Sequence, residues 1–231
     1  MTRKMICGAA VAALGPLMGG CVGEAEIAMP SDLRAVSERI ELRGLGGGER
    51  GSFRLGGSEG RFTRKSVKEQ YDDGYVRNSG GGSFTADGPE LGGALSARCA
   101  FDEAERDSGI LVHPVERLAY RCGFSRGLEP NGELVLDEVP RGRGLLAGRS
   151  RAGFLDYAGR RIGIGAIHDM EGGRMPAGTP LGYAFDVEGR QIGAVDLNGG
   201  DKTIYAPRSG PEREAVLAAS LALSIFWDPG D

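Results

Sequence analysis

The chain has 231 residues, with 28 Lys and Arg against 32 Asp and Glu, so its formal net charge is −4 at neutral pH. This balance disfavours a nucleic-acid partner, because such a partner requires basic surface that displaces counterions. Hydrophobic residues make up 40% of the chain and glycine accounts for 41 positions. Because the glycines alternate with short apolar runs, the composition predicts a folded core with many turns.

The first twenty residues have the layout of an export signal. Arg3 and Lys4 precede an uncharged run from Met5 to Gly20, which is the charged-then-apolar order of a secretory signal peptide. The run ends in Met18, Gly19, Gly20 and Cys21. This quartet resembles the lipobox of bacterial lipoproteins, in which small residues precede a cysteine that is lipidated. Met18 departs from the leucine that is usual at that position.

The lipoprotein resemblance implies a signal peptide over residues 1–20, a lipid-modified Cys21 and a tether over residues 21–35. Val22, and not an aspartate, follows the cysteine, which in lipoproteins favours the outer membrane, facing the periplasm. The alternative is ordinary signal cleavage near Ala25, which would give a soluble periplasmic protein.

From Ile40 to Tyr205 the chain is a succession of short β-like runs separated by glycine-rich turns. About a dozen such runs predict an all-β barrel or sandwich. The pattern Asp-x-x-Gly-Arg-x-Ile-Gly occurs from residue 156 and again from residue 186, and it predicts two hairpins whose first glycine has a positive φ. The second glycines, Gly163 and Gly193, would let another element, such as a helix, approach closely.

Cys99 and Cys122 lie in two runs whose apolar residues alternate, so both sulfur atoms are predicted to point inward from neighbouring strands. Export would place them in an oxidising compartment, where a disulfide persists. Two buried free thiols are the alternative. The cysteine and histidine spacing contains no metal-binding pattern, and we expect neither a metal nor a cofactor.

The most apolar stretch is near the C-terminus, where residues 212–227 predict a helix. Ser209 and Glu212 offer a capping box at its start, and Asp228 and the two residues after it stop it. From Ala215 to Trp227 only two serines interrupt the apolar residues. The helix therefore has no polar face and is predicted to be enclosed by protein. It is too short to cross a bilayer, which takes about 20 residues.

A many-stranded barrel followed by such an apolar helix resembles the tubby, phospholipid scramblase and LURP-like superfamily. The resemblance is carried by PLGYAFDVEGRQIGAVDL, Pro180 to Leu197, and by AVLAASLALSIF, Ala215 to Phe226. It implies a mainly β fold, with one domain over residues 36–231. In that domain an antiparallel barrel of about twelve strands would surround the central helix at residues 212–227.

Six arginines depart locally from the acidic balance of the chain: Arg141, Arg143, Arg149, Arg151, Arg160 and Arg161. The guanidinium group suits phosphate, and the superfamily resemblance implies an anionic lipid headgroup or glycolipid as the ligand. A solvated surface is the alternative. The sequence thus predicts a lipid-anchored envelope module that binds membrane, anionic lipid or an envelope protein. A structural partner of outer-membrane machinery is the second possibility.

The enzymatic alternative is an envelope serine hydrolase. Residues 56–60 fit the Gly-x-Ser-x-Gly pattern around Ser58, and His113 and His168 are the only histidines. That motif requires a strand before the serine and a helix after it, whereas a β-like run follows Ser58. Residues 46–51 likewise spell Gly-x-Gly-x-x-Gly but lead into a β-like run, so they predict a turn. We expect no catalytic residues and no enzymatic activity.

Overall fold

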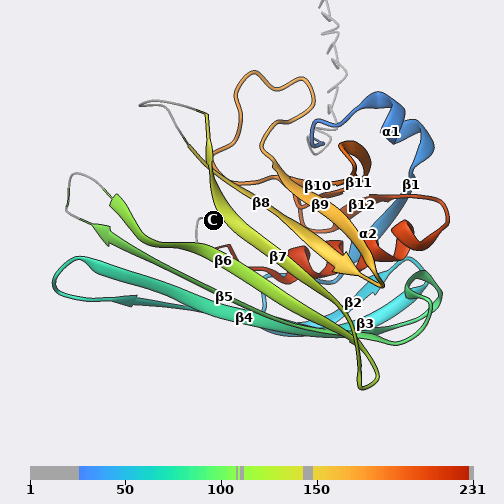
Figure 1. The fold of residues 1–231 in the computed structure, drawn as a ribbon, viewed down its shortest axis with the longest axis horizontal. Coiled ribbons are helices and arrows are strands. Elements are labelled where there is room, and N and C mark those ends of the chain that lie inside the picture. The colour runs from blue at the N-terminus through green and yellow to red at the C-terminus, as the bar shows by residue number, and fades with distance from the viewer. Residues whose placement is uncertain (1–25, 108, 110–111, 143–147, 229–231) are drawn as a thin grey trace, which may run out of the picture.

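The computed structural model describes residues 26–107, 109, 112–142 and 148–228, and these form a closed antiparallel barrel of twelve strands (Figure 1). The strands follow one another around the barrel in chain order from β2 to β12, and β1 closes it between β12 and β2. The predicted fold class is confirmed. None of the helices in these residues is both long enough and apolar enough to span a membrane.

The long strands lie on one side of the barrel, and β3 to β7 have 13 to 15 residues each. In Figure 1 the β3–β4 hairpin and the neighbouring ends of β5 and β6 project beyond the C-terminal end of helix α2. The strands are β1 (Glu38–Arg43), β2 (Arg50–Leu55), β3 (Ser58–Gln70), β4 (Tyr75–Asp87), β5 (Leu95–Asp107), β6 (Val112–Arg126), β7 (Glu129–Arg141), β8 (Gly148–Tyr157), β9 (Arg160–Ile167), β10 (Gly182–Val187), β11 (Arg190–Asp196) and β12 (Lys202–Ala206). The helices are α1 (Ser31–Val36), a 3₁₀ turn (Pro89–Leu91) and α2 (Pro211–Ile225).

Inward-facing side chains form layers across the long strands, because the antiparallel register places them opposite one another. The first three layers surround α2 and Phe226 and are apolar apart from Arg64 and Ser66 on β3. A fourth layer, beyond the end of α2, is mainly polar. In order along α2, the layers contain Phe84, Ala97 and Phe124; then Cys99, Cys122, Leu134 and Leu155; then Phe101, Tyr120 and Leu136; and last Lys68, Asn78, Glu103, Glu138 and Arg151.

Cys99 and Cys122 are bonded as a disulfide inside the barrel. They are directly opposite each other on β5 and β6, with their Cα atoms 4.0 Å apart. Both side chains are buried in the core that surrounds α2. The bridge therefore fixes the register of two central strands.

Helix α2 has no exposed face, since every residue from Ala215 to Ile225 is buried. Two inward glycines make room for it: a Cβ on Gly193 would lie 3.0 Å from Val216, and one on Gly82 would lie 3.2 Å from Ile225. The helix ends two residues earlier than predicted, because the backbone at Phe226 is extended. No side chain caps its start, so the predicted capping box is wrong, and Gly210 precedes the helix with a φ of 95°.

The predicted tether is wrong from residue 26 onward, because residues 26–36 pack against the outside of the barrel. Ile27 is fully buried among Ala194 and Tyr205, and its backbone N–H donates to Asp196 at 3.1 Å. Leu33 of α1 is also buried. The packed domain thus includes residues 26–35, which precede the predicted boundary at residue 36.

The two repeats form the β8–β9 and β10–β11 hairpins, as predicted. Their glycines Gly159 and Gly189 have φ of 77°. Ala158 and Glu188 before them also have positive φ, which the two-residue hairpin turn requires at both central positions. Only one of the second glycines faces the helix: Gly193 contacts Val216, whereas a Cβ on Gly163 would meet the carboxylate of Asp186.

Candidate functional site

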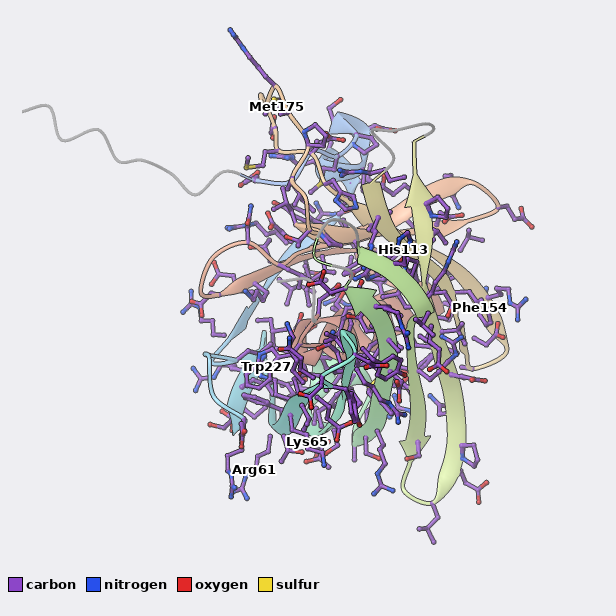
Figure 2. The ribbon with its side chains drawn as sticks, turned by 90° about the vertical axis from the view of Figure 1, so that its left-hand side faces the viewer. Arg61, Lys65, His113, Phe154, Met175 and Trp227 are labelled. Carbon is purple, nitrogen blue, oxygen red and sulfur yellow. A yellow bond between two sulfur atoms is a disulfide. The ribbon has the colours of Figure 1, made fainter. Side chains whose placement is uncertain are left out.

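Among the exposed basic side chains on the outer surface of β2 to β5, four are not paired with a carboxylate: Arg50, Arg61, Lys65 and Arg98. In the described part of the chain, none of the four has a carboxylate oxygen within 4.0 Å. Figure 2 shows Arg61 and Lys65 at the lower edge of the molecule, far from His113. We call this set of four residues the basic face.

The strand register arranges the basic face as a cross. Arg50, Thr63, Ser83 and Arg98 are opposite one another on four neighbouring strands. At about 4.8 Å per strand, the backbones of the two arginines are about 14 Å apart. Arg61 and Lys65 lie two residues on either side of Thr63, a step of about 7 Å each. The hydroxyl oxygens of Thr63 and Ser83 are 2.9 Å apart at the centre.

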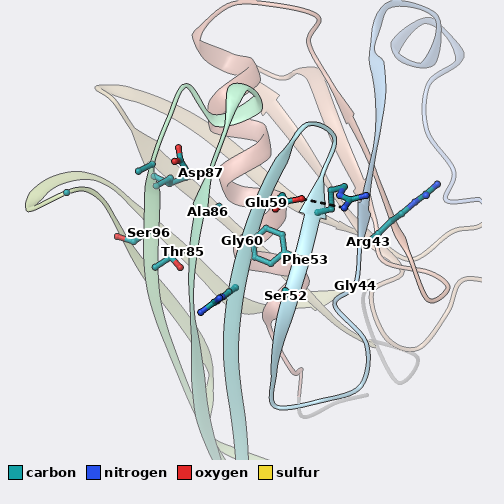
Figure 3. A pocket seen from close by; sticks show the side chains of 15 residues that line it. Arg43, Gly44, Ser52, Phe53, Glu59, Gly60, Thr85, Ala86, Asp87 and Ser96 are labelled. Carbon is teal, nitrogen blue, oxygen red and sulfur yellow. Dashed lines mark hydrogen bonds and ion pairs between the residues drawn. The ribbon is translucent and has the colours of Figure 1, made fainter.

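Two hollows lie along this face. The larger, of about 910 Å³, is lined in part by Arg61 and by the hydroxyl residues Ser52, Thr85 and Ser96 (Figure 3). Figure 3 shows α2 behind the strands that carry these residues, so this hollow is outside the barrel. The smaller, of about 460 Å³, is lined in part by Arg50, Thr63, Lys65, Ser83 and Arg98. Both combine cationic and hydroxyl donors.

Acidic residues lie only at the edges of the basic face. Glu49 precedes Arg50 and lines the smaller hollow. Glu59 and Asp87 line the larger one, and Glu59 is 3.4 Å from Arg54. The centre, around Thr63 and Ser83, has cations and hydroxyls but no carboxylate among its opposing residues. The surface is therefore locally cationic on a chain whose net charge is negative.

Sequence reasoning missed the basic face although a signal was present. Residues 61–68, RFTRKSVK, contain four basic residues and no acidic one. Strand alternation divides them, because Arg61 and Lys65 point outward while Arg64 points inward. The buried Arg64 donates to carbonyl oxygens of the β1–β2 loop and lies 4.7 Å from the centre of the Trp227 ring. A count of charges in the sequence cannot separate the outward-facing basic residues from the inward-facing ones.

The arginines that the sequence singled out do not converge. Arg149 and Arg151 are near the start of β8, beyond the C-terminal end of α2. Arg160 and Arg161 begin β9 at the opposite end of the barrel, where α2 starts. Residue 143, an arginine in the printed sequence, lies outside the described residues.

Each of the described arginines in that set already has an oxygen partner. Four have carboxylates, and Arg141 donates to a carbonyl. The partners are Ala177 for Arg141 at 2.9 Å, Glu105 for Arg149, Asp228 and Glu138 for Arg151, Glu212 for Arg160 at 2.9 Å, and Asp156 for Arg161 at 2.6 Å. The Arg161 hydrogen bond lowers the pKa of the Asp156 carboxyl. These arginines therefore offer less to an anion than the basic face does.

A cavity of about 500 Å³ lies inside the barrel, beyond the end of α2, and we call it the cup. Its wall is the fourth layer, with Lys68, Asn78, Glu103 and Arg151 among its residues. The Arg151 side chain is only 5% exposed and donates to Asp228 at 2.9 and 3.1 Å. The last described residue of the chain thus neutralises the buried arginine.

Glu103 is the buried carboxylate of the cup, with a relative exposure of 5%. It accepts a hydrogen bond from the Asn78 amide at 2.8 Å. Burial raises the pKa of the Glu103 carboxyl, the Asn78 hydrogen bond and the charge of Arg151 oppose the rise, and the charges of Glu105 and Asp228 add to it. This carboxylate has no ion-pair partner among the described residues.

Ser58 does not have the environment of a nucleophile. It begins β3 directly after a hairpin turn, its side chain is fully buried, and its hydroxyl accepts the backbone N–H of Glu90 at 3.0 Å. His168 is instead bound to Ser150 and to the Ala177 carbonyl, beyond the other end of β9. His113 starts β6 at that same far end of the barrel. The structure therefore does not bring Ser58 and a histidine together.

Within the described residues, no three His, Cys, Asp or Glu side chains are grouped so as to hold a metal ion. In comparisons with known proteins, no family model, curated protein or solved structure matches this chain. The arguments for function therefore come from the basic face and the cup themselves.

Proposed function

We propose that this chain is a lipid-anchored cell-envelope binding module that holds a phosphate-bearing lipid headgroup on its basic face. The observation that carries the proposal is the set of four exposed cations without carboxylate partners around the Thr63 and Ser83 hydroxyls. The lipobox-like Cys21 and the superfamily resemblance support the same class of function, since both would imply a barrel that works at a membrane.

Phosphate suits this arrangement for two physical reasons. Arginine presents paired N–H donors that match two phosphate oxygens, and lysine adds a compact point charge. The central hydroxyls can donate to the same group, because a hydroxyl rotates to suit its partner. A spread of about 14 Å between Arg50 and Arg98 is also wide enough for several headgroups at once.

The test is co-sedimentation of the chain from residue 26 onward with vesicles of phosphatidylcholine, with and without added phosphatidylglycerol. Near an anionic membrane each basic residue contributes about 1 kcal/mol, so changing all four residues of the basic face to Gln is expected to weaken binding about 100-fold or more. Binding by the unchanged chain should also fall as salt concentration rises.

A matched control removes the same charge elsewhere. Arg117, Arg174, Arg190 and Arg208 are exposed and have no ion-pair partner among the described residues. Changing these four to Gln is expected to leave vesicle binding within about threefold of the unchanged chain, apart from a small long-range effect. Equal losses in both variants, or binding that does not depend on the anionic lipid, would contradict the proposal.

A further inference from the structure

We propose that the cup binds a small organic cation, and that the Glu103 carboxylate receives its ammonium group. The cup is a second site on this molecule, inside the barrel, whereas the basic face is outside it. The inference rests on Glu103 and on the surroundings of the cup, and it does not depend on the proposed membrane function.

The first step is that Glu103 is a buried carboxyl group with no cationic nitrogen of the described residues within 4.0 Å. Its side chain is 5% exposed and lines the cup. A neutral amide, Asn78, is its hydrogen-bond partner. Burying a carboxylate in this way is costly unless a cation accompanies it. Lys68 is not that cation, because its ammonium group is not within 4.0 Å of the Glu103 carboxylate.

The second step is that the other cations of the cup are already engaged. Arg149 pairs with Glu105, and Arg151 pairs with Asp228 and Glu138. Asp107 adds a further carboxylate to the lining. Glu103 and Asp107 therefore remain without counter-ions among the described residues, and Lys68 is the one unpaired cation in the lining. A bound cation would compensate the unpaired negative charge in the lining of the cup.

The third step concerns the kind of cation. Metal ions such as Ca²⁺ take six or more oxygen ligands, and no group of three or more suitable side chains is present in the described chain. An ammonium group needs fewer acceptors, and Glu103 with the Thr179 hydroxyl can supply them. A volume of about 500 Å³ suits a small organic molecule. A compound with a primary amine on a short carbon chain fits these limits.

The experiment is a calorimetric titration of the chain from residue 26 onward with butylamine and with putrescine. Butanol and CaCl₂ serve as neutral and metal comparisons. We expect the amines to bind and both comparisons to fail. Glu103→Gln should weaken amine binding at least about tenfold, because a charge-assisted hydrogen bond is lost. Glu133→Gln, which changes an exposed carboxylate on the outside of β7, should bind as the unchanged chain does.

Two further readouts make the outcome decisive. Ethanolamine and vesicles containing phosphatidylethanolamine are titrated separately, so that a free amine is distinguished from a lipid headgroup as its source. The NMR titration of the Glu103 carboxyl should move to lower pH when the amine is present, since a nearby cation favours the ionised form. Absence of binding by both amines, or equal binding by Glu103→Gln, would overturn the proposal.

Discussion

Arg151 shows how this barrel accommodates a charge in its interior. Its guanidinium faces two carboxylates that are each 7% exposed, Glu138 from β7 and Asp228 after α2. Buried ion pairs are costly to form, but removing one partner leaves an uncompensated charge. The stability of the cup wall therefore depends on a residue that the sequence indicated only as one member of an arginine-rich stretch.

We expect Arg151→Ala to lower the free energy of unfolding by about 3–5 kcal/mol, because the buried Asp228 loses its cation and the buried Glu138 keeps only Arg149, at 3.7 Å. Arg161→Ala is the matched comparison. Its pair with Asp156 is exposed, with side chains 66% and 44% accessible. An exposed pair contributes at most about 1 kcal/mol. Urea unfolding followed by circular dichroism measures both, and equal losses would show that the Arg151 pairs do not have a buried, stabilising role.

At this scale the sequence identified arginines but could not separate paired from unpaired ones. The partners come from distant parts of the chain: Asp228 is 77 residues from Arg151, and Glu105 is 44 residues from Arg149. Such pairs depend on barrel closure and register, which no local pattern determines. The basic face on β2 to β5 can be recognised only when it is known which residues of these strands point inward and which point outward.

At the scale of elements, α2 was predictable because it lacks a polar face, and its burial is confirmed. The strands were predicted too short. The sequence predicts short β-like runs, whereas β4 extends over the 13 residues Tyr75–Asp87. The reason is that the outer halves of β3 to β7 enclose the cup, and their inward residues are polar, such as Asn78 and Glu103. Alternation of apolar and polar residues, the signal for a half-buried strand, is lost there.

The disulfide between β5 and β6 gives an element-scale prediction. It closes a loop with a sequence separation of 23 residues. In the chain-entropy model such a loop contributes about 3 kcal/mol. We expect the double change of Cys99 and Cys122 to Ala to lower the free energy of unfolding by about that amount.

The unchanged chain, reduced while it is unfolded, should lose the same free energy of unfolding. Because the reduced chain keeps both cysteine side chains, this comparison distinguishes the effect of the disulfide bond from the effect of side-chain packing. Denaturant unfolding in oxidising and reducing buffer measures the difference. If reductant has no effect on the unchanged chain while thiol labelling of the unfolded protein finds both thiols free, the bond does not form in solution.

At the scale of the whole molecule, the barrel has two chemically different ends. At one end α2 begins, and the interior is filled by apolar layers and aromatic rings. At the other, α2 stops and the interior becomes the charged cup. The N-terminal segment also packs near this second end, since Ile27 bridges to Met170, which follows β9. The sequence indicated the barrel and its helix, but it gave no sign that the helix fills only part of the interior.

The position of residue 26 limits the distance between the barrel and a lipid anchor. An extended chain spans at most about 3.5 Å per residue, so the five steps from Cys21 to Glu26 reach no more than about 18 Å. A tether through residue 35 would have reached much farther. Because residues 26–36 pack on the barrel, a lipid on Cys21 would hold the cup end close to the membrane surface.

Mass spectrometry of the chain extracted from a bacterial envelope tests this anchor. We expect the N-terminal peptide to begin at Cys21 and to carry a diacylglycerol and an added acyl group. Detergent should be needed for extraction, since two or more acyl chains hold a protein stably in a bilayer. Cys21→Ala should abolish the acylated peptide, while the barrel keeps its circular dichroism spectrum. An unmodified N-terminus near Ala25 in the unchanged chain would instead favour a soluble periplasmic protein. In that case the basic face would have to provide all of the membrane affinity.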